Sequence, residues 1–148
     1  MTPQASIARN KISIKKTFAA AREKLFSAWT DPEILKKWFG PSDEWVVRVE
    51  ALPVRAGGRF TIVLAEKSGT EHELTGFFDQ VAAPEKLVFS WAWEGDEYFG
   101  ENRVTVELRE AGASTELALT HGLFPDKKLV ASHEEAWNRR LERLAKAL

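Results

Sequence analysis

The chain has 148 residues, of which 44% are hydrophobic and 29% charged, a balance typical of a soluble globular protein rather than of a disordered one. Its formal net charge of −1 excludes a strong general attraction to nucleic acids or to anionic membranes. It contains no cysteine, which excludes disulfides, thiol catalysis and cysteine-ligated metals.

The length suits a single domain, and no repeat, low-complexity run or flexible linker divides the chain. We therefore predict one domain over residues 1–148, with a loosely ordered tail over about 1–8. No apolar stretch reaches the ~18 residues that a membrane-spanning helix needs, and residues 1–10 lack the pattern of a secretory signal. We expect a cytoplasmic protein that neither inserts into membranes nor binds nucleic acid.

The first predicted element is a half-buried strand over about 12–18, where apolar and polar residues alternate. Over residues 19–29 the apolar residues then recur at helical spacing, which predicts a first helix. The run 31–33, Asp-Pro-Glu, then starts a second helix, because Asp is a favoured N-cap, Pro fits the first helical position and Glu suits the positive helix end. Gly40 and Pro41 end it. The sequence therefore predicts two short helices after the first strand.

From residue 45 onward the apolar residues recur at every second position, which predicts strands separated by turns that contain glycine or proline. These strands are expected near residues 45–52, 58–66, 70–81, 86–94, 102–110 and 114–121. Turns this short join antiparallel neighbours, since parallel strands need long crossovers. We predict an antiparallel meander with one covered face and one wet face.

The last segment has the period of a helix, with apolar positions at steps of three and four. These positions are Leu129, His133, Trp137, Leu141, Leu144 and Leu148. Asp126 or Ser132 could begin this helix, which in the first case is roughly 30 Å long and could cross a curved sheet. We predict that Trp137 and Leu144 are largely buried, together with Leu141 between them, and that Arg140 and Arg143 lie on the wet side.

Several short motifs, in this order, resemble those of a known family. They are Phe18 in the first strand, the runs 28–33, 38–41, 57–60 and 84–91, and His133, Trp137, Leu141 and Leu144 in the last helix. Over about residues 6–148 the chain resembles the activator of heat-shock protein 90 ATPase homologue family, within the START-like, pollen-allergen-like (SRPBCC) superfamily. The resemblance implies an α+β helix-grip fold, in which a six- or seven-stranded curved antiparallel sheet wraps around the long C-terminal helix.

The resemblance also implies a cavity for an apolar molecule between sheet and helix. Members of the superfamily include lipid carriers, hormone receptors, polyketide cyclases and cochaperone domains, so the fold alone leaves the function open. The leading expectation is the binding of a small hydrophobic ligand, lipid-like or polyketide-like, in this cavity. One alternative is a chaperone-assisting interaction module, with a chaperone as partner. The other is a cavity enzyme of cyclase, hydrolase or dehydratase type.

Aromatic residues are the main candidates for lining the cavity. Six Trp and nine Phe exceed what a core of this size needs for ordinary packing, which favours a cavity or interface lined by some of them. The candidates are Trp38, Phe39, Trp45, Trp91, Trp93, Phe99 and Trp137. The competing interpretation is a filled core, to which we assign Trp29, Phe60 and Phe78.

The three histidines complete the candidate set. His121 and His133 fall on inward positions, where they could hydrogen-bond a ligand or act as an acid–base pair near neutral pH. The alternative is that both are satisfied imidazoles that only cap the pocket. His72, on a middle strand, is expected to point inward as well. No two of the three have a metal-ligand spacing, so we expect no metal and no cofactor.

Overall fold

An eight-stranded sheet and three helices make up the described chain, residues 10–95 and 102–148 of a computed structural model. The strands are β1 (Ile12–Phe18), β2 (Val46–Ala51), β3 (Arg59–Ala65), β4 (Glu71–Ala82), β5 (Lys86–Ser90), β6 (Ala92–Trp93), β7 (Arg103–Ala111) and β8 (Ser114–Gly122). The helices are α2 (Arg22–Thr30), α3 (Pro32–Trp38) and α4 (Lys127–Ala147). Among these helices none is long and apolar enough to cross a membrane.

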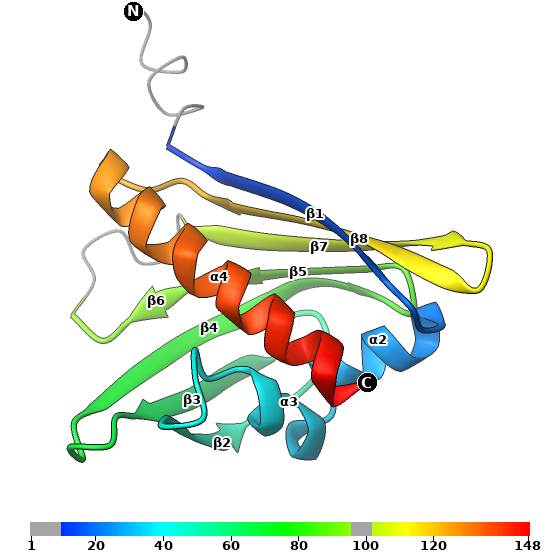
Figure 1. Cartoon of the computed structure of the whole chain (residues 1–148). Helices are drawn as coiled ribbons and strands as arrows, with labels where there is room; N and C mark the ends of the chain where they lie inside the picture. Colours follow the sequence, from blue (N-terminus) through cyan, green and yellow to red (C-terminus); the bar gives the residue numbers. More distant parts are fainter. Residues whose placement is uncertain (1–9, 96–101) are drawn as a thin grey trace, which may run out of the picture.

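The sheet is antiparallel at every described pairing, as the short turns predicted. Its order is β1-β8-β7-β5-β4-β3-β2, and β6 pairs with β4 beside this path. Helix α4 lies across one face of the sheet, and α2 and α3 lie near its C-terminal end (Figure 1). The predicted α+β helix-grip fold is therefore confirmed, including the two short helices after the first strand.

Two aspartates begin helices, because their carboxylates accept hydrogen bonds from otherwise unpaired amides of the first turn. Asp31 accepts from the amide of Glu33 at 2.9 Å and caps α3. Asp126 accepts from the amide of Leu129 at 2.9 Å and caps α4. Of the two predicted starts of the last helix, Asp126 is therefore correct, and Ser132 lies inside the helix.

The strand predicted over 86–94 is divided at Trp91. Strand β5 pairs with the far half of β4 and with β7, whereas β6 pairs with Leu74 and Thr75 of β4. At the division the amide of Trp91 donates to the carbonyl of Asn102 at 3.0 Å. Because the alternation is interrupted here, Ser90 and Trp91 are both buried although they are adjacent in sequence.

The buried face of α4 is wider than predicted. Trp137, Leu141 and Leu144 are buried, which confirms the predicted phase of the helix. The prediction for Arg140 is wrong: only 3% of this side chain is exposed, because α3 packs against that flank of α4. Arg143 is half-buried against the same helix, where it donates to the carbonyl of Lys37 at 3.0 Å.

Candidate functional site

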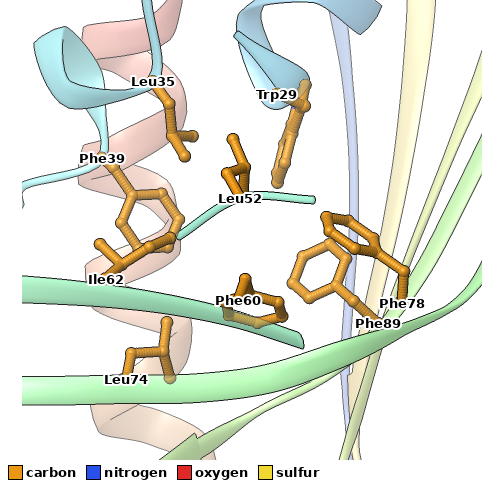
Figure 2. Close-up of a pocket in the computed structure, with 9 residues that line it drawn as sticks. All are labelled: Trp29, Leu35, Phe39, Leu52, Phe60, Ile62, Leu74, Phe78 and Phe89. Atoms are coloured by element: carbon orange, nitrogen blue, oxygen red, sulfur yellow. The ribbon is translucent and has the colours of Figure 1, made fainter. Parts of the chain in front are cut away.

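The centre of the core is almost filled by side chains that point toward one another (Figure 2). The residues around it are Trp29, Leu35, Phe39, Leu52, Phe60, Ile62, Leu74, Phe78 and Phe89. The remaining space of about 20 Å³ is close to what one water molecule needs, and an apolar lining keeps such a space dry. A ligand does not fit here without movement of side chains, and Trp29, Phe60 and Phe78 are core residues as predicted.

A larger cavity lies between α4 and the strands β3, β4 and β6, and we call it the α4 cleft. Its volume is about 480 Å³, within the range of roughly 300–1,000 Å³ that is typical of small-molecule sites. The cleft is lined by Pro41, Trp45, Leu64, His72, Trp93, Ser132, His133, Ala136 and Arg140. On the helix side the wall runs from Ser132 to Arg140, about 12 Å at 1.5 Å per residue. The fold thus provides a cavity between sheet and helix, as in ligand-binding modules of this architecture.

The structure divides the predicted site residues into three groups. Those that line the α4 cleft are Trp45, His72, Trp93 and His133. Phe39 borders the filled centre instead. Those that are fully buried and border neither space are Trp38, Trp91, His121 and Trp137. Phe99 lies outside the described residues.

His72 lies at the rim of the cleft and not deep inside it. Its imidazole is 45% exposed and contacts the carboxylate of Glu66 at 2.7 Å. The ring centroids of Trp45 and Trp93 lie 5.7 and 6.4 Å from that of His72. His72 therefore lines the cleft, but it is not buried inside it as an inward orientation would imply.

His133 makes a hydrogen bond through each of its two ring nitrogens. Its Nδ1 is 2.9 Å from the carbonyl oxygen of Leu129, and its Nε2 is 3.1 Å from the indole nitrogen of Trp93. A carbonyl only accepts and an indole N–H only donates, so the proton of His133 is on Nδ1. Both ring nitrogens are therefore engaged within the protein.

His121 is held in the same way, one layer deeper. The indole N–H of Trp137 donates to its Nδ1 at 2.9 Å, so its Nε2–H donates to the side-chain oxygen of Asn102. The ring centroids of His121 and His133 are 5.7 Å apart, so the two histidines do converge as expected. However, neither offers a free nitrogen to the cleft, which favours the interpretation as satisfied imidazoles over an acid–base pair.

Stability is expected to fall in acid because of His121. Burial is the largest cause that lowers its pKa well below the ordinary value of 6.5, followed by repulsion from His133 when that ring is protonated and from Arg140. Below pH 6.5 the unfolded chain therefore binds a proton that the folded chain does not bind. The free energy of unfolding should decrease by about 1.4 kcal/mol for each pH unit in this window and should show no such dependence above it. Urea unfolding at stepped pH measures this slope.

The variant that tests this prediction replaces the buried histidine itself. His121→Gln should remove about one proton from the pH dependence of the free energy of unfolding. An equal slope in the His121→Gln protein and the original one would show that another group is responsible.

Arg140 is a residue of the cleft that the sequence interpretation placed on the wet side of the helix. Its Nε–H donates to the carbonyl of Phe39 at 2.7 Å, and its guanidinium lies 4.9–5.7 Å from the ring centroids of Phe39, Trp91 and Trp137. Burial lowers its pKa to about 10, so the side chain is still a cation at neutral pH. A usable signal existed, since Arg140 follows His133 by seven residues and so lies on the same face of the helix.

Comparisons with known proteins agree with the fold. The family model described as Activator of Hsp90 ATPase homolog 1-like protein matches residues 19–148. The solved structure of an AHSA1-like protein from Aeromonas hydrophila is 25% identical, with a TM-score of 0.80 over 93% of this chain and 90% of that chain. The AHSA1 protein from Silicibacter pomeroyi is 26% identical, with a TM-score of 0.79 over 92% and 95%.

A Chromobacterium violaceum protein shares the fold, with a TM-score of 0.86 at 22% identity over 93% of this chain and 96% of that chain. None of the curated proteins matches the chain in sequence.

Proposed function

Because the chain belongs to the family of Activator of Hsp90 ATPase homolog 1-like proteins, we propose that it binds a small hydrophobic ligand, lipid-like or polyketide-like, in the α4 cleft. The observation that carries this proposal is the cleft itself, about 480 Å³ in volume, in a protein whose central core is otherwise filled. Trp45, Leu64 and Trp93 supply the apolar and aromatic walls on which such a ligand would lie.

Binding without catalysis is supported by the state of the two histidines. An acid–base pair needs a nitrogen within reach of the substrate, and both nitrogens of His121 and of His133 are hydrogen-bonded inside the protein. The cavity-enzyme alternative would therefore require these hydrogen bonds to break first.

The alternative of a chaperone-assisting module needs a docking surface. Large exposed apolar patches usually mark such surfaces. Within residues 10–95 and 102–148, the exposed large hydrophobic residues are Val46 and Leu123, at 67% and 39% exposure. They lie on β2 and just after β8, toward opposite edges of the sheet, so they form no common patch.

A neutral apolar dye tests the proposed function. The emission of N-phenyl-1-naphthylamine rises in apolar sites, and we expect a saturable rise with this protein that decanol reverses by competition. Ala136→Phe places an aromatic ring in the cleft from the side of α4 and should weaken the binding of the dye by tenfold or more. Ala145→Phe makes the same change at an exposed position of the same helix, outside the cleft lining, and should leave dye binding unchanged.

The contrary outcomes are equally specific. Absence of saturable binding, of both the dye and decanol, would contradict the binding function. Equal effects of the two phenylalanine substitutions would place the ligand elsewhere than in the α4 cleft.

A further inference from the structure

A buried cation without a carboxylate partner borders the α4 cleft. Arg140 is 3% exposed, and no carboxylate of the described residues forms an ion pair with it. Its Nη1 is buried and has no hydrogen-bond partner within the described chain. Buried cations in proteins are normally paired, because a charge withdrawn from water loses several kcal/mol of hydration.

The existing contacts of Arg140 satisfy only part of the guanidinium. The hydrogen bond from Nε uses one of its five N–H groups. The aromatic rings of Phe39, Trp91 and Trp137 interact with the positive charge but accept no conventional hydrogen bond. The group therefore has unused donors, Nη1 among them, and an uncompensated charge, and its side chain forms part of the cleft wall.

The rest of the cleft is suited to the other end of an amphiphile. One and two turns before Arg140 on the same face of α4 lie Ala136 and His133, and across from them lie Leu64 and Trp93. His133 and the indole N–H of Trp93 are hydrogen-bonded to each other, so this part of the wall has little left to offer a polar group. The cationic group of the cleft is therefore at the Arg140 end, with apolar surface from Ala136, Leu64 and Trp93 beside it. At the far end Ser132 and His133 are both hydrogen-bonded to the carbonyl of Leu129.

We propose that the natural ligand is an amphiphilic carboxylate, whose carboxylate binds Arg140 and whose apolar body lies along α4 toward His133. This inference rests on the proposed function and specifies the ligand class for the same site. A carboxylate matches the planar fork of a guanidinium, and hydrogen bonds between two charged groups are shorter and stronger than neutral ones. Inside a cleft this interaction is also screened less by salt than a surface ion pair.

Three ligands with the same chain and different heads test the proposal on the unmodified protein. Displacement of N-phenyl-1-naphthylamine at neutral pH should rank decanoate first, decanol second and decylamine, which is a cation at that pH, last. We expect decanoate to bind at least tenfold more tightly than decanol. Equal affinities of decanoate and decanol, with both binding in the cleft, would overturn the proposal and leave the proposed function intact. If none of the three displaces a dye that binds saturably, this proposal is overturned, and if the dye does not bind saturably either, the proposed function fails as well.

The arginine is then tested directly. Arg140→Met replaces the guanidinium by an apolar side chain of similar length and so removes the charge. The affinity for decanoate should then fall by about tenfold to a hundredfold, while the affinity for decanol changes little. Arg140→Lys keeps the charge without the fork and should give an intermediate loss for decanoate. Arg139 is an exposed neighbour on the same helix, and Arg139→Met should change the affinity for neither ligand.

These variants separate recognition from a purely structural role. If Arg140 only supports the fold, Arg140→Met weakens decanoate and decanol by the same factor, or weakens neither, and either result overturns the proposal. If that variant does not fold, the head-group ranking on the unmodified protein and the Arg140→Lys result still decide the matter.

Discussion

Truncation of Trp137 to alanine is expected to lower the free energy of unfolding by about 3–5 kcal/mol, the range for a buried aromatic side chain. Trp137 is completely buried where α4 meets the sheet, and its ring lies 5.7 Å from Trp29 and 5.3 Å from Trp91, measured between centroids. Alanine would leave a cavity among these rings. It would also leave Nδ1 of His121 without the indole donor that it accepts from at present. Urea unfolding followed by circular dichroism measures the loss.

Glu142→Ala is the control for Trp137. It lies on the same helix with its side chain exposed, and exposed substitutions usually change stability by less than about 0.5 kcal/mol. A loss below about 1 kcal/mol for Trp137→Ala, or a similar loss for Glu142→Ala, would mean that α4 does not pack by the face described.

Gly76→Ala is expected to destabilise the protein by about 3 kcal/mol, at the upper end of the usual range for overpacking. A Cβ at this position would lie 2.2 Å from the carbonyl oxygen of Ser90 and 2.6 Å from the ring of Phe60. The oxygen belongs to the backbone at the end of β5 and cannot move alone. The ring of Phe60 packs against Phe78 and Phe89, with centroids 5.6 and 5.7 Å away, in the filled centre of the core (Figure 2).

The direction of this expected change is informative, because the intrinsic strand propensities of glycine and alanine alone would predict that the substitution stabilises the protein. Glycine inside a strand is normally worse than alanine by roughly 0.5–1 kcal/mol, so without the close approach Gly76→Ala would stabilise β4. Thr75→Ala, at the neighbouring half-buried position, should stay within about 1 kcal/mol of the original. A stable Gly76→Ala protein in urea unfolding would show that β4 and Ser90 are further apart than described.

The order and type of the elements could be predicted because they depend on local patterns. Alternation at every second residue and short turns were sufficient for the antiparallel sheet, and the Asp-Pro-Glu run was sufficient for the start of α3. For α4 the sequence offered Asp126 and Ser132, and the structure decides for Asp126. The division of the strand at Trp91 could not be predicted in this way. It depends on which part of β4 each half meets, and that pairing is a tertiary property.

The site was predictable to a lesser degree for a related reason. The parity of a strand or the phase of a helix shows which side chains point inward, but not how deep they lie. Trp91, Trp137 and His121 point inward and are buried in packed layers, whereas Trp93 and His133 point inward and reach the cleft. Arg140 was misplaced because charge suggested solvent, while the flank that it occupies is covered by a helix about 100 residues earlier in the chain.

The contacts of Arg140 and Arg143 also determine which parts of the molecule can open separately. Helix α3 has seven residues, too few to be stable alone in water. The end of such a short helix would normally fray, because its last carbonyl groups have no partner within the helix. Here the carbonyl of Lys37 accepts a hydrogen bond from Arg143, and the carbonyl of Phe39 accepts one from Arg140. The two helices therefore form one cooperative unit, and the amides of α3 should exchange with deuterium only when α4 also detaches.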